Sequence, residues 1–546
     1  MNDERTDATP PKTPDSGALA AAVRVISGVT LLSRFTGLAR DIVTARLFGD
    51  DVLGSAFRAA YAFPNLFRRL FGEGALSAAF IPEYTTLRAK SPDAAAQLAS
   101  LILWLLMLAT GSITLLIEAA LFVRLLFPHG EDLGLSIRLV MLMLPMMPLV
   151  CSTAMLAGVL QVHGKFGVPA AAPILLNVFQ IAAGLAFFLG ISADATIAAY
   201  SVGTAAVAAS LAQVLWSLWA LRGLVRWRRA FDDAKESGRV VLRRFVPVML
   251  GLGTLQLNST MDMLIAMWPT WVGPTMLGFA VTLDERSNAV LGYTQTIYQF
   301  PLGVFGIAVA TAIFPLLARA AGDGDAFASM LRRGVRLSLF IGLPASAGML
   351  LVREDVCAVI FGGGGKYSFS DEGVLRSAAV LGGFAPAIWA YSLNHVLTRA
   401  FYAKGDTHTP MRVAMAMVGF NLALNFALIW PLREAGLAWS TAISASVQTL
   451  VLIVLSRRRL GLVVFDRETR IGVARLLIAC AVMIGLIVVA GLMLGQAATW
   501  SGHLVRLAAL VCAGAGAYFA MAWVMRLPEP RWLMERGPRG GATIIE

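Results

Sequence analysis

Residues 470–495 read RIGVARLLIACAVMIGLIVVAGLMLG, and only Arg470 and Arg475 in this run are charged. About 20 consecutive apolar residues form an α-helix long enough to cross the hydrocarbon layer of a bilayer. A segment of this kind has to be helical in lipid, because no water is present there to satisfy an open backbone. The run therefore predicts a membrane-spanning helix.

Similar runs recur along the whole chain of 546 residues, of which 58% are hydrophobic and only 14% are charged. A soluble protein of this size would need more charged residues to cover so much apolar surface, so soluble enzymes are excluded. We expect an all-α polytopic membrane protein with about 14 transmembrane helices. The expected segments are residues 18–48, 52–87, 95–127, 135–162, 168–190, 193–223, 244–272, 287–319, 330–352, 375–402, 410–431, 435–456, 470–495 and 503–526.

Basic residues are concentrated in one set of loops, and acidic or neutral residues in the loops between them. The first set includes the stretch from Arg222 to Arg244 and the run Arg457–Arg459, whereas the second includes Asp50 and Asp284. Because basic loops stay in the cytoplasm, this alternation predicts that both termini are cytoplasmic. The formal net charge of +12 then reflects membrane topology, and no binding to nucleic acid is expected.

Two short sequence echoes indicate an internal repeat. Residues 79–82 (AFIP) resemble residues 312–315 (AIFP), and residues 164–169 (GKFGVP) resemble residues 405–410 (GDTHTP). The two offsets are nearly equal, which is typical of two homologous six-helix halves with the same orientation in the membrane. The expected domains are a disordered cytoplasmic tail (1–17), an N-terminal lobe (18–223), a basic cytoplasmic linker (224–243), a C-terminal lobe (244–459), two additional helices (460–527) and a cytoplasmic tail (528–546).

The first two expected segments contain arginines that a membrane-spanning helix rarely carries. Residues 33–41 read SRFTGLARD, and residues 63–75 read FPNLFRRLFGEGA. An arginine at mid-bilayer costs at least about 2.5–3.5 kcal/mol, so it has to face water, a partner or a ligand. Arg34 and Asp41 are seven residues apart and share a helix face, which would let them partly neutralise each other.

We expect Arg34, Arg40 and Arg68 to line a cationic cavity between the two halves. A guanidinium stays charged when buried and binds phosphate through two parallel hydrogen bonds, so the ligand would be a phosphate or diphosphate. The alternative is that arginines of these segments reach the membrane interface or pair with nearby acids. That alternative applies most to Arg46 and Arg69.

These two stretches resemble the amino-terminal signature of the MurJ (MviN) lipid II flippases. Residues 298–308 (YQFPLGVFGIA) resemble the eighth-helix motif of that family, and residues 401–410 (FYAKGDTHTP) resemble its loop between the tenth and eleventh helices. The resemblance covers about residues 20–525. It implies the MATE-like fold of the MOP superfamily, with two six-helix lobes and two additional helices whose hydrophobic groove holds a polyprenyl tail.

The resemblance also implies which residues bind the substrate. The arginines match those that line the family's substrate cavity, with two acids as neighbours and an asparagine from the same signature. The expected substrate-binding residues are therefore Arg34, Arg40, Asp41, Asn65, Arg68 and Glu73.

The chain departs from the family pattern at three positions. Thr296 stands where the family usually has an arginine, Gln295 stands where an acid is common, and Ser55 replaces a usual acid. A cavity with one arginine fewer would bind a diphosphate less tightly or accept a different carrier lipid.

Sodium-dependent relatives place an acid in the seventh helix and polar residues in the eleventh and twelfth helices around the ion. The matching residues here are Asp262, Asn421, Asn425 and Thr441. A carboxylate beside amide and hydroxyl oxygens suits a hard cation, so sodium is a possible ion, and no other cofactor is expected. The alternative is that Asn421 and Asn425, one turn apart, form hydrogen bonds between helices.

The composition predicts a multi-pass membrane protein. The resemblance implies that it lies in the bacterial cytoplasmic (inner) membrane and moves lipid II, the undecaprenyl-diphosphate-linked disaccharide pentapeptide, across it by alternating access for cell wall synthesis. Flipping needs no covalent chemistry, so we expect no catalytic residue; the expected partners are lipid II and membrane lipids, and the expected state is a monomer. The alternative is a same-fold exporter of another polyprenyl-diphosphate-linked glycan or of small molecules. A membrane glycosyltransferase would need larger loops, and a membrane scaffold would not need buried arginines.

Overall fold

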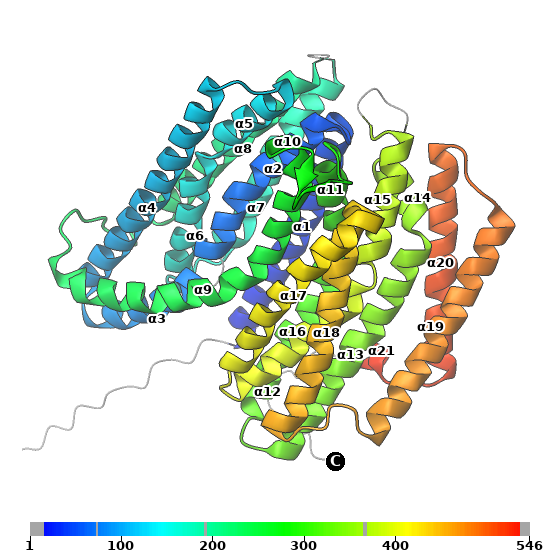
Figure 1. Ribbon diagram of the computed structural model, residues 1–546. Helices are drawn as coiled ribbons and strands as arrows, with labels where there is room; N and C mark the ends of the chain where they lie inside the picture. The colour runs from blue at the N-terminus through cyan, green and yellow to red at the C-terminus, as the bar shows by residue number, and fades with distance from the viewer. Residues whose placement is uncertain (1–15, 73–74, 191–193, 364–367, 535–546) are drawn as a thin grey trace, which may run out of the picture.

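The computed structural model describes residues 16–72, 75–190, 194–363 and 368–534. Its first lobe, blue to cyan in Figure 1, consists of α1 (Ser16–Phe48), α2 (Val52–Phe67), the π-helix η1 (Arg68–Gly72), α3 (Ala75–Lys90), α4 (Pro92–Leu126), α5 (Glu131–Met143), α6 (Met146–Val162), α7 (Gly167–Phe188) and α8 (Ala195–Ala220). Within this lobe α1 packs against α7, α7 against α8, and α2 against α5.

The second lobe, green to light orange in Figure 1, follows the short 3-10 helix η2 (Asp232–Ala234). It consists of α9 (Lys235–Ala266), α10 (Trp268–Trp271), β1 (Thr275–Met276), β2 (Phe279–Ala280), α11 (Ser287–Pro301), the π-helix η3 (Leu302–Gly306), α12 (Ile307–Arg319), α13 (Gly324–Leu351), α14 (Arg353–Ile360), α15 (Asp371–Phe384), α16 (Ala387–Ala403), α17 (His408–Leu432) and α18 (Glu434–Leu460). The two strands form an antiparallel hairpin, in which Thr275 lies opposite Ala280 and Met276 lies opposite Phe279.

Three further helices, α19 (Arg467–Leu494), α20 (Trp500–Val524) and the short α21 (Glu529–Met534), lie at the outer side of the second lobe (Figure 1). α19 packs against α13, and α20 packs against α14. The two long helices approach each other closely at Gly514, where an added Cβ would lie 2.6 Å from Cδ1 of Ile487. In lipid such small residues allow the close van der Waals packing that holds helices together.

The helices run between two ends of the molecule. The upper end in Figure 1 carries the α1–α2 connection, α10 and the start of α15, and the lower end carries α3, the α8–α9 connection and α21. Both α1 and α21, the first and last helices described, have their outer termini at the lower end. Residues 1–15 of the expected N-terminal tail lie outside the described residues.

Eleven helical segments among the described residues are long and apolar enough to cross a membrane. They correspond to eleven of the expected segments, and they confirm an all-helical polytopic membrane fold. The other three expected segments, 18–48, 52–87 and 244–272, correspond to α1, to α2 with η1 and α3, and to α9. These are helical but do not meet the same criterion, so the number of 14 spans stays a prediction.

The helix α9 connects the two lobes. Its first half packs on α3, and Val241 and Phe245 are buried in a core formed by residues of the first lobe. Its second half packs on α17 of the second lobe. The expected linker 224–243 thus contains the start of a long helix, and the exact domain boundaries stay predictions.

A proline precedes a π-helical turn in each lobe. Pro64 in α2 is followed by η1, and Pro301 at the end of α11 is followed by η3. Proline lacks the N–H that would bond the carbonyl oxygen four residues earlier, so the regular helical ladder is interrupted next to each π-helical turn. Arg68 and Arg69 lie in the first of these turns and Gly303 in the second, and all three lie where the lobes face each other.

Candidate functional site

A polar cavity of about 310 Å³ lies between α1, α2 and η1 of the first lobe and α9 and α11 of the second lobe. Its lining is basic: among the described lining residues, five arginines face a single carboxylate. The other polar lining residues are amides and hydroxyls. The charged residues are Arg34, Arg40, Asp41, Arg58, Arg68 and Arg69, and the neutral polar ones are Tyr61, Asn65, Gln256, Ser259, Thr260, Asn288, Gln295, Thr296 and Gln299.

Arg40 is held firmly on the wall of this cavity. Its Nε and Nη2 donate to Oδ1 of Asp41 at 3.0 and 2.7 Å, and its Nη1 donates to the Tyr61 hydroxyl at 2.6 Å and to Oδ1 of Asn177 at 3.0 Å. The Arg40 guanidinium also lies 4.9 Å from the centre of the Tyr61 ring. These contacts fix the position of the charge without neutralising the cavity as a whole.

Arg34 lies against the second lobe. A Cβ built on Gly303 would lie 2.1 Å from Nη1 of Arg34, so the guanidinium occupies the space that this glycine leaves open. Beside it, the rings of Phe35 and Phe300 meet edge to face at 5.2 Å. Among the described residues Arg34 makes no hydrogen bond or ion pair. The expected pairing of Arg34 with Asp41 is therefore wrong, because Asp41 pairs with Arg40 and lies 3.7 Å from Nη1 of Arg58.

The second signature stretch contributes two more arginines. Nε of Arg68 donates to Oδ1 of Asn65 at 3.3 Å, and Nη1 of Arg69 donates to Oε1 of Gln256 on α9 at 2.9 Å. Asn65 in turn donates to the backbone oxygen of Tyr61 at 3.0 Å, which keeps its amide on the cavity side of α2. Glu73 lies outside the described residues, so its expected role stays a prediction.

Arg58 was not predicted from the sequence, although it lines the same cavity. It donates to the backbone oxygen of Gly292 on α11, and its guanidinium lies 4.8 Å from the centre of the Tyr293 ring. A signal for it exists, because Arg58 lies seven residues before Asn65 and ten before Arg68, on one face of the helix. Besides Asp41 of its own lobe, its partners are Gly292 and Tyr293 of the other lobe, and these could not be recognised from the sequence.

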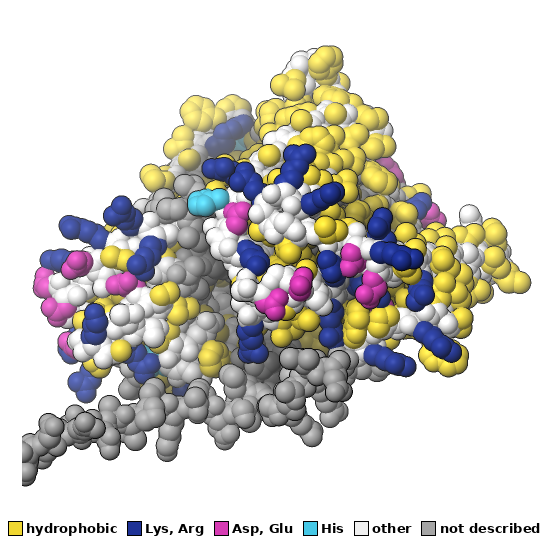
Figure 2. Space-filling model, turned by 90° about the horizontal axis from the view of Figure 1, so that it is seen from below, with side chains coloured by type: hydrophobic (Ala, Val, Ile, Leu, Met, Phe, Trp, Pro, Cys, Tyr) yellow, Lys and Arg dark blue, Asp and Glu magenta, His cyan; other side chains and the backbone are white. Residues whose placement is uncertain are grey.

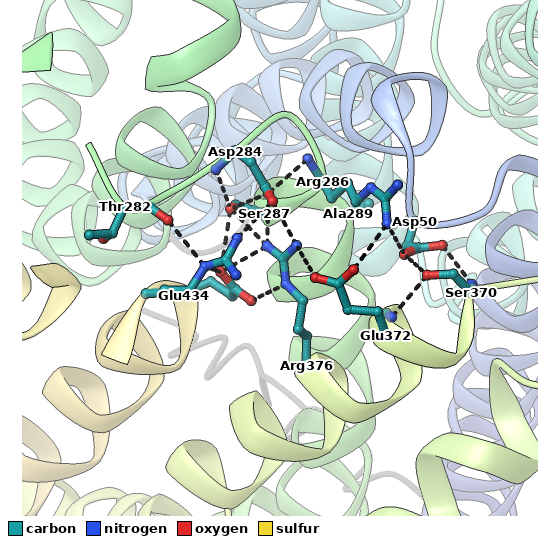
Figure 3. A network of polar contacts seen from close by, with 12 residues as sticks. Asp50, Thr282, Asp284, Arg286, Ser287, Ala289, Ser370, Glu372, Arg376 and Glu434 are labelled. Carbon is teal, nitrogen blue, oxygen red and sulfur yellow. Dashed lines mark hydrogen bonds and ion pairs between the residues drawn. The ribbon is translucent and has the colours of Figure 1, made fainter. Parts of the chain in front are cut away.

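The two lobes are joined at the upper end by buried polar contacts (Figure 3). Oδ1 of Asp50 accepts the backbone N–H of Ser370 at 2.8 Å, and its Oδ2 accepts the Ser370 hydroxyl at 2.7 Å. Arg46 donates to the backbone oxygens of Val359 and Ile360 at 2.6 and 3.0 Å. These contacts link the end of α1 and the turn after it to α14 and the start of α15, and so they close the upper end.

An ion cluster stands beside these contacts (Figure 3). Arg376 of α15 donates to both carboxylate oxygens of Asp284 at 2.7 and 2.8 Å, and its Nε donates to Oε1 of Glu434 at 2.7 Å. Arg433 adds a second contact to Asp284 at 2.7 Å. The cluster connects the loop before α11 with α15 and the α17–α18 junction, so it fixes the elements of the second lobe that face Asp50.

The four residues expected to hold sodium are brought together by α9, α17 and α18. Asn425 donates to Oδ1 of Asp262 at 2.7 Å, Thr441 donates to Oδ2 of Asp262 at 3.4 Å, and Asn425 donates to Oδ1 of Asn421 at 3.4 Å. Ser440, which was not predicted, donates to Oδ1 of Asn425. All five side chains are buried. The alternative of hydrogen bonds between helices is thus also present, and a role in ion binding stays a prediction.

A family model described as lipid II flippase MurJ matches residues 44–508 of the chain. The chain belongs to this family. The probable lipid II flippase MurJ of Rhizobium tropici is 31% identical over 478 residues, which are 85% of each chain. That of Vibrio cholerae is 29% identical over 519 residues, 91% of this chain and 94% of the relative. The lipid II flippase MurJ of Burkholderia cenocepacia is 27% identical over 536 residues, 93% of this chain and 97% of the relative.

Solved structures support the same fold. The structure titled lipid II flippase MurJ, inward closed conformation, superposes with a TM-score of 0.75 at 20% identity, covering 93% of this chain and 99% of that one. An inward-facing MATE family transporter of the MOP superfamily superposes with a TM-score of 0.61 at 16% identity, covering 81% of this chain and 98% of that one. The MATE-like arrangement of two lobes expected from the MurJ resemblance is therefore confirmed.

The positions that depart from the MurJ family pattern have defined places in the structure. Thr296 and Gln295, which stand where the resemblance leads us to expect charged residues, both line the cavity and add no charge to it. Ser55 is buried at the contact between the lobes, where its hydroxyl accepts the backbone N–H of Ala289 at 3.0 Å. Its backbone oxygen accepts a hydrogen bond from Asn288 at 2.8 Å. Ser55 thus contacts the second lobe through uncharged hydrogen bonds.

A second cavity, of about 300 Å³, lies where the MurJ resemblance places a lipid-tail groove. It is formed by α19, α20 and the end of α13, and its wall is mainly apolar. The lining residues are Leu351, Ile487, Val488, Gly491, Leu492, Gly495, Gln496, Arg506 and Leu510.

Proposed function

We propose that this protein moves lipid II from the inner to the outer leaflet of the bacterial cytoplasmic membrane by alternating access. The observation that carries the proposal is the arginine-lined cavity between two lobes of a chain that belongs to the lipid II flippase MurJ family. The diphosphate of the head group is the anion that several fixed guanidinium groups would bind. The head group would cross through the cavity while the polyprenyl tail stays in the α19–α20 groove.

The distribution of basic residues supports an orientation. Lys and Arg side chains are spread over the lower face of both lobes (Figure 2). Because basic segments stay in the cytoplasm, the lower end and both termini are cytoplasmic in our proposal. The exposed arginines at this end include Arg226, Arg228, Arg229, Arg457, Arg458 and Arg459.

In this orientation the structure represents a state that is closed toward the outside. The Asp50–Ser370 and Arg46–Val359 contacts hold the upper ends of the lobes together. The head group would enter from the cytoplasmic side, and rocking of the lobes would break these upper contacts to release it. Each charge that moves through the membrane potential is worth about 2.3 kcal/mol per 100 mV, so the potential can bias the cycle.

No covalent step is needed, so the protein acts as a transporter and not as an enzyme. The residues that line the cavity come from both lobes of one chain, which supports a monomer.

Complementation tests this proposal. A strain depleted of its own lipid II flippase should regain growth when it produces this protein, and lipid II should no longer accumulate in its inner leaflet. The variant Arg34→Ala should fail to rescue, and Gly303→Val should fail in the same way because its side chain displaces the Arg34 guanidinium. The matched control is Arg124→Ala, since Arg124 is exposed at the end of α4, away from the cavity.

Wild-type protein that is inserted in the membrane but does not rescue would contradict lipid II as the cargo. Rescue of a strain that lacks the flippase of another polyprenyl-diphosphate-linked glycan would then support the alternative cargo.

We also propose that the buried Asp262 cluster binds sodium. A bound ion stabilises the folded state by mass action, so replacing potassium with sodium should raise the melting temperature of the purified protein. Asp262→Asn removes the charge while keeping the shape of the side chain, and it should abolish the sodium effect. Equal melting temperatures of the wild type in the two salts would show that the cluster is only a set of hydrogen bonds between helices.

A further inference from the structure

The hairpin between α10 and α11 presents large apolar side chains away from the protein. Leu277 at its turn is 75% exposed, Phe279 is 68% exposed and Val272 is 65% exposed. The surrounding stretch, residues 263–283, contains no charged residue. Soluble surfaces rarely gather exposed apolar side chains in this way, so the exposure indicates an interaction site.

The turn itself carries a residue that is unusual in water. Leu277 and Gly278 both have positive φ angles, of 53° and 85°. A two-residue hairpin turn with this geometry normally takes Asn, Asp or Gly, because a left-handed backbone costs other residues about 1–2 kcal/mol. Leucine is therefore disfavoured here both by its backbone and by its exposure to water. Contact with lipid would remove the second cost.

The hairpin also adjoins a surface that faces lipid. The ring of Phe279 meets the ring of Trp430 edge to face at 5.9 Å, near the end of the membrane-spanning helix α17. α17 has an exposed stripe at helical spacing that leads to this point, formed by Arg412, Ala416, Gly419, Phe420, Ala423, Ala427 and Pro431. Apart from Arg412 near the lower end of α17, this stripe is uncharged. The apolar face of the hairpin thus continues the apolar face of a spanning helix.

Aromatic and charged residues mark the level of the hairpin relative to the membrane. Trp268 donates its indole N–H to the backbone oxygen of Thr275, and Trp271 donates to the Ser136 hydroxyl. Tryptophan is enriched where the hydrocarbon meets the head groups. On the other side of the hairpin the chain returns to the ion cluster at Asp284. The hairpin therefore lies at a boundary between an apolar and a polar region.

We infer that Leu277 and Phe279 at the tip of this hairpin, together with Val272 at the end of α10, insert into the boundary between head groups and acyl chains of the leaflet at the upper end. The partner is the lipid surface itself. Because Trp271 contacts α5 of the first lobe and Thr282 contacts Ile429 of the second, the insertion anchors the chain at the place where the two lobes adjoin.

A spin label at the tip tests the inference. Leu277→Cys is combined with Cys512→Ser, which removes the exposed native thiol, and the labelled full chain is reconstituted into vesicles of phosphatidylcholine and phosphatidylglycerol. Collisions of the label with oxygen, which is concentrated in lipid, are compared with collisions with a water-soluble nickel chelate. The control label is placed at Asp371→Cys, an exposed position at the start of α15 at the same end.

The ratio of oxygen to nickel collisions should be several-fold higher at position 277 than at position 371. Val272→Cys provides a second label and should give the same result if the turn variant folds poorly. A ratio at 272 and 277 equal to that at 371 would place the tip in water and overturn the inference. Protection from both reagents would overturn it too, because it would mean that a second copy of the chain covers the tip. The measurement detects lipid contact alone, so it is independent of the cargo.

Discussion

Replacing Arg376 by alanine is expected to destabilise the protein by about 3–5 kcal/mol, because it leaves the buried carboxylate of Glu434 without the arginine that pairs with its Oε1. Glu434 is 2% exposed, and Arg376 is the partner of its Oε1 at 2.7 Å. Asp284 would keep Arg433 but lose the two parallel hydrogen bonds from Arg376. The loss should appear as a lower melting temperature of the purified protein in detergent.

Two companion variants separate the causes. Arg376→Lys keeps the charge but cannot reach both carboxylates with a planar fork, so its stability should lie between those of the wild type and the alanine variant. Arg124→Ala, at an exposed position, should leave the melting temperature unchanged. A melting temperature of Arg376→Ala equal to that of the wild type would contradict the structural importance of the cluster.

The same cluster should give stability a dependence on acid pH. Burial would raise the pKa of Asp284, but the hydrogen bonds and charge of Arg376 outweigh burial and lower this pKa from 3.8 to about 2. A carboxyl group with a lowered pKa stabilises the folded state above its unfolded pKa, and this contribution is lost as the pH falls through the folded pKa. The contribution of Asp284 should thus be complete above about pH 4 and decline toward pH 2, and it should be smaller in Arg376→Ala.

The second large effect is expected at Arg40, where alanine should abolish rescue of a flippase-depleted strain. The substitution removes one of the positive charges of the cavity and the contacts to Asp41, Tyr61 and Asn177 at once. Among the described residues, Asp41 would then keep Arg58 as its one cationic neighbour, at 3.7 Å, so the site would become less attractive to an anion.

Two measurements make this result specific. The amount of protein in the membrane has to equal that of the wild type, which excludes a failure of insertion. Arg40→Lys should rescue partly, because it restores the charge but not the hydrogen bonds of a planar guanidinium. If Arg40→Ala rescued as well as the wild type at equal abundance, the role of Arg40 in holding the head group would be wrong.

Part of the candidate site could be predicted because the cost of a charge in lipid is visible in the sequence. Arg34, Arg40 and Arg68 stand in otherwise apolar segments, and all three line the cavity. Asp262, Asn421, Asn425 and Thr441 could be grouped only through the resemblance to the MurJ family, since they lie on three helices far apart in the chain. The structure adds Ser440 to that group, and the sequence offered no signal for it.

The asparagines that follow the second pair of echoes have different partners in the two lobes. Asn177 and Asn421 follow the second pair of echoes in the two halves. Asn177 accepts a hydrogen bond from Arg40, whereas Asn421 belongs to the cluster around Asp262. The two asparagines therefore support oppositely charged residues in the two lobes. Asn177 lies 13 residues after Gly164 and Asn421 lies 16 residues after Gly405, so their positions in the repeat differ by about one helical turn.

The sequence by itself determined the membrane class and the helical fold, because hydropathy is a local property: the run 470–495 is apolar whatever surrounds it, and it forms α19. Only the tertiary structure decided which charges are paired. In the sequence Asp50 and Asp284 are acidic residues of loops. In the structure Asp50 joins the two lobes and Asp284 pairs with Arg376. Arg58 likewise contacts Gly292 on the other lobe. The reason is physical: the free energy of a charge depends on its burial and on partners within a few ångströms, and the folded chain brings those partners together from distant parts of the sequence.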